Sequence, residues 1–186
     1  MSIKINYLNQ KNNTSSKNLI LFSDEKFKIE GLKKYLSSSD FLYIKDILKT
    51  SDLKKNLFVF EISSSKKIIL ASIKNNSKIS DIENLGAELY GRINYGKDNE
   101  YFIISDSIAT KQNNILGHFL HGLKLKSYEF NKYKSKKETR LITISVLGNK
   151  NKPSVQNQLK FKAIEEGTFL ARDLVSEPGN ILHPDE

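Results

Sequence analysis

Segments with two different apolar periods alternate along this chain, and the alternation constrains the fold more than any other feature. Ile3, Ile5 and Tyr7 repeat at every second residue, as in a strand with one buried face. Ile82 and Leu85 begin a run with the three- and four-residue spacing of an amphipathic helix. The same patterns predict strands at 3–8, 19–22, 57–62, 68–73, 101–104 and 141–147, and helices around 41–48, 82–93, 115–123 and from 153 onward. Strands separated by helices indicate an α/β layered fold in a single domain of ordinary size.

Turn and cap residues predict where these elements begin. The polar tract 9–17 is typical of a turn, and the short polar link 63–67 predicts a hairpin between two strands. The predicted helix starts are Ser39 or Asp40 for the helix around 41–48, Ser80 with Glu83 as a capping box for the helix 82–93, and Pro153 in the first turn of the last helix.

The end of the sequence predicts a junction. The last helix is expected to reach Val175 and to stop before Pro178, because proline disfavours the helical conformation of the residue before it. Pro184, Asp185 and Glu186 have the composition of a first helical turn, with acids near its positive end. We therefore expect the sequence to stop where a further element begins.

The last helix is apolar around most of its circumference. One stripe at four- and three-residue spacing is expected to pack on the sheet of this domain, and other apolar residues extend the surface further round the helix. A helix that is apolar all round needs cover on more than one side. The expected stripe is Val155, Leu159, Ala163, Gly167, Leu170 and Leu174, and the additional residues are Phe161, Ile164, Phe169, Ala171 and Val175.

The formal net charge of +9 raises the possibility of nucleic-acid binding. The cations are mostly lysines spread along the chain, and the arginines, which are the usual readers of phosphates and guanines, are only Arg92, Arg140 and Arg172. A solvated lysine-rich surface is therefore favoured over a binding surface. The chain has no cysteine and no apolar run long enough for a membrane span, so we expect a cytoplasmic protein that does not contact a membrane.

Residues 127–137, S-Y-E-F-N-K-Y-K-S-K-K, interleave aromatic rings with lysines. Such a segment could stack on the bases of a single strand and bind its phosphates. It could equally be an extended connector with its rings packed inward and its lysines in water. The residues alone favour the connector.

No catalytic, metal-binding or substrate-binding residue is predicted in this chain. His118 and His121 are three residues apart and could share one helix face for a metal, but no acid or third histidine has a supporting spacing, so surface histidines are favoured. The glycines do not form a phosphate loop: Gly86, Gly91 and Gly96 fall mostly within a helix, and Gly117 and Gly122 are expected to allow close packing.

Two segments resemble the cytosol (leucyl) aminopeptidase family. S-Y-E-F-N-K-Y-K-S-K-K, from Ser127, is similar to the family stretch G-S-Y-R-F-D-R-Y-K-S/T-K-K. A-R-D-L-V-S-E-P-G-N-I-L-H-P-D-E, from Ala171, is similar to A-R-D-L-V-N-E-P-A-N-x-L-T-P-x-x, which joins the two domains of that family. Ser176 and Gly179 depart from the usual Asn and Ala.

The resemblance implies an amino-terminal domain of such an enzyme. The expected fold is α/β, with a macro-domain-like mixed sheet, helices on both faces and a long interdomain helix at the end. Residues 1–150 would form the domain, and residues 151–186 the helix and junction to a catalytic domain that the sequence does not contain. The domain would serve assembly or access to the active site, and a nucleic-acid-binding module that uses the lysine-rich surface stays the alternative.

The resemblance also implies the chemistry and partners of the parent. It would remove amino-terminal residues from peptides, with two divalent metals, zinc or manganese, that activate a bridging water. The family's metal ligands lie in N-T-D-A-E-G-R-L and in a lysine motif before it, neither of which occurs here. The parent is expected to be a homohexamer, and this chain alone a catalytically inactive monomer or weak dimer.

Overall fold

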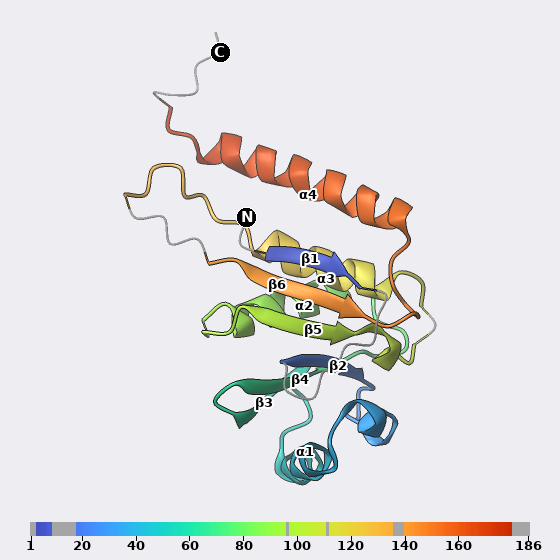
Figure 1. Cartoon of the computed structure of the whole chain (residues 1–186). Coiled ribbons are helices and arrows are strands. Elements are labelled where there is room, and N and C mark those ends of the chain that lie inside the picture. Colours follow the sequence, from blue (N-terminus) through green and yellow to red (C-terminus); the bar gives the residue numbers. More distant parts are fainter. Residues whose placement is uncertain (1–2, 9–17, 96, 111, 136–139, 180–186) are drawn as a thin grey trace.

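A computed structural model describes residues 3–8, 18–95, 97–110, 112–135 and 140–179 as one sheet with helices around it (Figure 1). The predicted order of strands and helices is confirmed. The turn predicted at 9–17 and the helix start predicted at 184–186 lie outside the described residues. The elements are β1 (Ile3–Tyr7), β2 (Leu19–Ser23), the short 3-10 helix η1 (Glu30–Tyr35), α1 (Ser38–Thr50), β3 (Leu57–Ser63), β4 (Lys66–Ser72), α2 (Ile79–Ile93), β5 (Glu100–Ile104), η2 (Ser105–Ser107), α3 (Ile115–Lys126), β6 (Ile142–Leu147) and α4 (Val155–Ser176).

The six strands form one mixed sheet in the order β1-β6-β5-β2-β4-β3. Every neighbouring pair is parallel except β3 and β4, which form the predicted antiparallel hairpin. Ile3 of β1 lies opposite Ile142 of β6, so the beginning of the chain pairs with its last strand. This pairing places β1 at one edge of the sheet, beside α3 and α4 (Figure 1).

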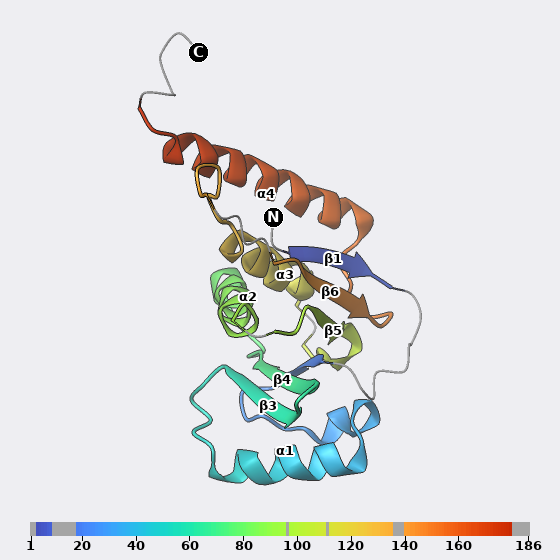
Figure 2. The ribbon, with the colours of Figure 1, turned by 60° about the vertical axis from the view of Figure 1, so that its left-hand side comes forward.

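Helices cover both faces of the sheet, as predicted (Figure 2). Successive side chains of a strand point to opposite faces, so a buried strand supplies two cores. In β2, Ile20 and Phe22 join the core that contains α2 and α3, whereas Leu19 and Leu21 join the core that contains α1. Phe22 meets Phe119 of α3 edge to face, with ring centroids 5.1 Å apart.

Two glycines let α2 and α3 approach until their backbones touch. A Cβ atom on Gly86 would lie 1.9 Å from the carbonyl oxygen of Phe119, and one on Gly122 would lie 1.9 Å from the carbonyl oxygen of Glu83. A Cβ on Gly117 would meet Asn114 in the same way, at 2.5 Å from its side-chain oxygen. The close packing predicted for Gly117 and Gly122 is therefore confirmed.

The helix starts differ from the predicted caps. The N-cap of α1 is Ser37, whose hydroxyl accepts a hydrogen bond from the backbone N–H of Asp40 at 3.1 Å, so Ser39 and Asp40 are wrong as caps. Asp40 is buried and pairs with Lys66 at 2.6 Å across the domain. In a run of three serines and an aspartate, the tertiary partner of the aspartate decides which residue is left to cap the helix.

The capping box predicted from Ser80 and Glu83 is also wrong. α2 begins two residues earlier, after the N-cap Lys78, whose backbone N–H donates to the carboxylate of Asp81 at 3.2 Å. Glu83 is instead directed to α3, where it contacts His118 at 2.9 Å.

α4, in contrast, starts later than predicted. Its N-cap is Ser154, whose hydroxyl accepts from the backbone N–H of Asn157 at 3.2 Å, so Pro153 precedes the cap and is not in the first turn. The helix runs to Ser176, one residue beyond the predicted Val175. None of the helices in the described part of the chain is long and apolar enough to cross a membrane.

Candidate interdomain interface

The inner side of α4 packs on α3 (Figure 1). The ring of Phe161 lies against two histidine rings of α3, 5.0 Å from His118 and 4.9 Å from His121. One turn further on, Oε1 of Glu165 contacts Nδ1 of His121 at 2.9 Å. Glu165 and Phe169 are the buried residues of α4. A ring, a carboxylate and a second ring at four-residue spacing therefore hold α4 to the domain.

The outer side of α4 is apolar and exposed. We define the outer face as Val155, Leu159, Ile164, Leu170 and Leu174, whose exposed fractions range from 44% to 71%. The prediction that the stripe through Val155 and Leu174 packs on the sheet is therefore wrong. At about 100° per residue, this stripe and the inner residues lie on roughly opposite sides of the helix. Both sides of the helix carry apolar residues. The inner side is the one that packs on the domain, because the Phe161 ring fits against the two histidine rings of α3.

A face of this kind indicates a binding partner. Single exposed apolar residues are common on proteins, but several large ones on one helix mark an interaction surface. Val175, at the end of the same helix, is 87% exposed and continues the apolar surface. The outer face of α4 is the candidate interface of this domain.

The segment 127–135 is tied to the carboxyl-terminal half of α4. The Tyr128 hydroxyl donates to Asp173 at 2.8 Å. Lys132 Nζ lies 2.5 Å from Glu177 Oε1, and the Tyr133 hydroxyl donates to the other oxygen of the same carboxylate. These bonds from Lys132 and Tyr133 lower the pKa of the Glu177 carboxyl, and the bond to Glu177 raises the pKa of Lys132.

These contacts favour the connector over a nucleic-acid surface. Tyr128 and Phe130 are half-buried, whereas Tyr133 stays exposed, so the expectation of inward rings holds for the first two only. Lys132 is already paired with a carboxylate, and a phosphate would have to displace Glu177. Residues 136–139 of the same segment lie outside the described residues.

A groove of about 500 Å³ lies between the connector and α4. Phe130 and Lys132 line one side of it, and Leu170, Asp173 and Leu174 line the other. Leu170 and Leu174 belong to the outer face as well, so the groove extends the candidate interface to the point where the chain leaves α4.

The two histidines of α3 serve as links between helices. His121 is buried against Glu165, so its prediction as a surface histidine is wrong, and His118 is partly exposed beside Glu83. Within the described ranges, no three His, Cys, Asp or Glu residues are grouped so that they could hold a metal ion. The acids that the sequence analysis missed lie 35 and 44 residues away, on α2 and α4, where helix spacing gives no sign of them.

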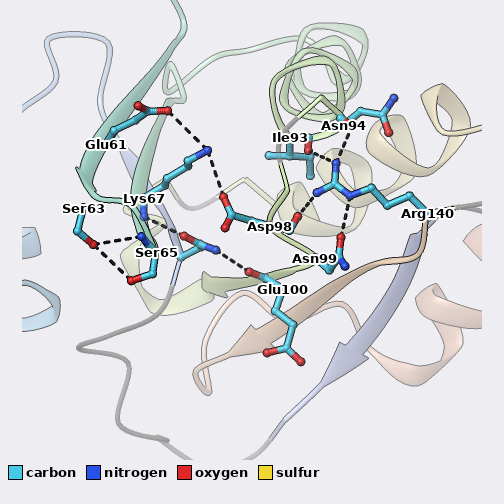
Figure 3. A network of polar contacts seen from close by, with 11 residues as sticks. Glu61, Ser63, Ser65, Lys67, Ile93, Asn94, Asp98, Asn99, Glu100 and Arg140 are labelled. Carbon is cyan, nitrogen blue, oxygen red and sulfur yellow. Dashed lines mark hydrogen bonds and ion pairs between the residues drawn. The ribbon is translucent and has the colours of Figure 1, made fainter.

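A polar network at the amino-terminal ends of β4, β5 and β6 is the other cluster of charged residues (Figure 3). Lys67 Nζ lies 3.1 Å from Asp98 and 3.6 Å from Glu61, and the bond to Asp98 raises its pKa. Arg140 donates to the side chain of Asn99 at 2.7 Å. The guanidinium also donates to the backbone carbonyls of Ile93, Asn94 and Asp98. The carbonyls of Ile93 and Asn94 lie at the end of α2, and that of Asp98 lies just before β5, so the network is structural and leaves Arg140 committed to the backbone.

No family model matches the sequence. Curated relatives do: a probable cytosol aminopeptidase of Clostridium perfringens (strain 13 / Type A) is 38% identical over 96 residues, which are 48% of this chain and 20% of the relative. A probable cytosol aminopeptidase of Ehrlichia ruminantium (strain Gardel) is 33% identical over 54% of this chain and 20% of the relative. The matches thus cover about half of this chain and about a fifth of the curated relatives.

Solved structures share the fold at low sequence identity. A mutant of tomato leucine aminopeptidase aligns with a TM-score of 0.73 and 17% identity, over 100% of this chain and 41% of that chain. The cytosol aminopeptidase of Coxiella burnetii aligns with a TM-score of 0.62 and 15% identity, over 97% and 35%. The chain is thus related in sequence to cytosol aminopeptidases and matches the amino-terminal domain of leucine aminopeptidase in fold, consistent with an amino-terminal domain of that family.

Proposed function

We propose that this chain is the non-catalytic amino-terminal domain of a leucyl-type aminopeptidase. Residues 1–150 form the domain, with a macro-like fold, and residues 151–186 form the helix and junction that lead to the catalytic domain. The observation that carries the proposal is the outer face of α4, an apolar surface at the end of a chain that spans about a fifth of the curated relatives it matches. The relatives' names supply the activity of the parent.

The parent removes amino-terminal residues from peptides by two-metal hydrolysis, with zinc or manganese. The described residues of this chain do not fit such a centre, since they offer no group of three metal-binding side chains. The proposal therefore assigns both metals and every catalytic step to the part of the parent outside this chain.

The role of this domain is to support assembly or to limit access to the active site. The outer face of α4 contacts the catalytic domain of the parent, because several large exposed apolar side chains on one helix need cover. The parent is a cytoplasmic homohexamer; the cytoplasmic location is supported by relatives that are named cytosol aminopeptidases.

The test compares this chain with the complete protein encoded by its gene. Both are assayed for release of 4-nitroaniline from leucine 4-nitroanilide, with added zinc or manganese. We expect hydrolysis by the complete protein and a rate equal to the metal-only blank for residues 1–186. Activity of the isolated chain would contradict the proposal, as would a complete protein that is folded, binds metal and has no aminopeptidase activity.

A further inference from the structure

A cavity of about 300 Å³ separates the free edge of β1 from α4, with α3 as its floor. β1 contributes Ile5 and Tyr7, and α3 contributes Leu120 and Lys124. Leu159 of α4 stands at the mouth, where it is 62% exposed. This volume is at the lower end of the range of roughly 300–1,000 Å³ that ligand pockets occupy.

Charged side chains of both signs line the same cavity: Lys124 and Glu165 lie within it, and the exposed Lys162, which pairs with Glu166 at 3.7 Å, also contributes to the lining. Lys124 Nζ donates to the backbone carbonyl of Ile3 at 2.6 Å. Burial lowers the pKa of Lys124, and the negative charge of Glu165 acts in the opposite direction. The two groups therefore interact through space, although they are not within the 4.0 Å of an ion pair. Both groups line the cavity, so a ligand bound there would contact the two of them.

Neither charge is fully paired by the protein. Of the described residues, only Ile3 accepts a hydrogen bond from the Lys124 ammonium, and no carboxylate among them forms an ion pair with it. Lys124 is half-buried, and an ammonium that has lost part of its water is ordinarily paired with an anion. Glu165 uses one oxygen for His121, and its second oxygen has no hydrogen-bond partner among the same residues.

We propose that this cavity binds a free α-amino acid with an apolar side chain. The ligand carboxylate accepts from Lys124, the ligand ammonium donates to Glu165, and the side chain lies against Ile5, Leu120 and Leu159. A zwitterion fits better than an anion such as phosphate, because Glu165 repels a second negative charge and the cavity has no arginine for bidentate binding. The inference stands on the cavity alone and does not depend on the parent being an aminopeptidase.

The test is a titration of the 186-residue chain with leucine, followed by amide and methyl chemical shifts. We expect saturable shifts at Ile5, Leu120 and Leu159, with a Kd on the order of 1 mM, as for a ligand of so few atoms. Two probes divide the contacts: 4-methylpentanoate lacks the ammonium, and 3-methylbutylamine lacks the carboxylate. Each should bind roughly tenfold more weakly than leucine, which is the effect of one lost charged hydrogen bond.

Matched variants assign the contacts to residues. Lys124→Met and Glu165→Gln should each weaken leucine binding roughly tenfold. Lys126→Met, on the same helix as Lys124, and Glu129→Gln, on the connector, change exposed residues that do not line the cavity and should leave leucine binding unchanged. The probe titrations need no variant, so they decide even where a substitution unfolds the chain. The proposal is overturned if leucine causes no saturable shifts at these residues, if 4-methylpentanoate or phosphate binds as tightly as leucine, or if folded Lys124→Met binds leucine as the native chain does.

Discussion

At the residue scale, the contacts that hold α4 in place are few and specific. His121 and Glu165 are both buried and contact each other at 2.9 Å, whereas His118 and Glu83 form a similar contact that is partly open to water. The same residue types at nearly the same distance should therefore differ in their effect on stability, because a polar group left without a partner costs more when water cannot reach it.

His121→Ala should lower the free energy of unfolding by about 1–3 kcal/mol, because it leaves the buried carboxylate of Glu165 without its partner. His118→Ala is the control, and should cost less than about 1 kcal/mol, as for other exposed charged contacts. Urea unfolding monitored by circular dichroism measures both. Equal losses in the two variants would mean that burial of the pair does not determine its contribution.

Tyr7 makes a prediction for alkaline pH. Burial, assisted by the negative charge of Glu165, raises the pKa of Tyr7 to about 12. An unfolded tyrosine titrates near pH 10, so between pH 10 and 12 the unfolded chain loses this proton first and the native state becomes less stable. Tyr7→Phe has no such proton, and its stability should fall by up to about 2.7 kcal/mol less over this interval. Urea midpoints at pH 9.5 and 11.5 provide the comparison, and parallel losses in both proteins would argue against a buried Tyr7 phenol.

At the element scale, helix spacing predicted where helices form but not which side of α4 is buried. Both sides are apolar: Phe161 and Phe169 on one, Leu159 and Leu170 on the other. The choice between them depends on what α3 presents, and α3 presents two histidine rings and room for a phenylalanine. The capping box of α2 was mispredicted because it, too, depends on a contact with another helix. The Glu83 carboxylate contacts His118 of α3 and does not cap the start of α2.

The assignment of the two sides of α4 can be tested by substitution. Phe169→Ala removes a ring that is 7% exposed and lies 5.5 Å from Tyr128, and should cost about 3 kcal/mol. Leu170→Gln changes a residue that is 61% exposed, and should alter the stability of this chain by less than about 0.5 kcal/mol. A large loss with Leu170→Gln in this chain would show that the outer face is covered within the domain. In the complete parent, the same variant is expected to weaken the contact between domains.

The contact between α2 and α3 predicts opposite effects of two glycine substitutions. Gly122→Ala would place a Cβ atom 1.9 Å from the Glu83 carbonyl and force the helices apart, at a cost of at least about 1–3 kcal/mol. Gly91→Ala, on α2, meets no atom within 4 Å and should stabilise the helix by up to about 1 kcal/mol. Thermal unfolding of the two variants and of the native chain shows whether each substitution raises or lowers the stability. A tolerated Gly122→Ala would mean that α2 and α3 are further apart than described.

At the scale of the whole molecule, the outer face of α4 and the net charge act on association in opposite directions. The apolar face favours association, and the charge of +9 opposes it at low salt. We expect residues 1–186 to be a monomer or a weak dimer at micromolar concentration, and raised salt should shift the chain toward the dimer. Light scattering coupled to size exclusion measures the mass. A stable hexamer would mean that the assembly contacts lie in this domain.

The same charge allows a test of the nucleic-acid alternative. Lys132 of the connector and the Arg140 guanidinium are both engaged by protein oxygens, so we expect only weak binding of single-stranded DNA. Binding that does occur should be lost steeply with salt if it rests on phosphate contacts. The affinity is measured by the fluorescence anisotropy of a labelled oligonucleotide at salt concentrations from roughly 50 to 200 mM, where binding through phosphate contacts weakens strongly. Tight binding that persists across this range would favour a nucleic-acid-binding module over an accessory domain.

The sequence by itself determined the strands, the helices α1 to α4, their order and the layered class of the fold, whereas the short helices η1 and η2 were not predicted. The apolar periods of strands and helices are local properties, and they identified β1 through β6 and the long final helix because burial of one face imposes them wherever the element lies in space. The motifs around Ser127 and Ala171 are local as well, and they indicated the family before any contact was known.

Only the tertiary structure decided which elements became neighbours. The pairing of β1 with β6, the burial of His121 against Glu165 and the exposure of Leu170 and Leu174 all depend on residues far apart in the chain. Period and spacing describe a residue relative to its own element, and they carry no information about which of two apolar faces, or which of several acids, meets a partner on another element. That choice is made by packing and charge in three dimensions, which is why the interface and the cavity beside β1 emerged only from the fold.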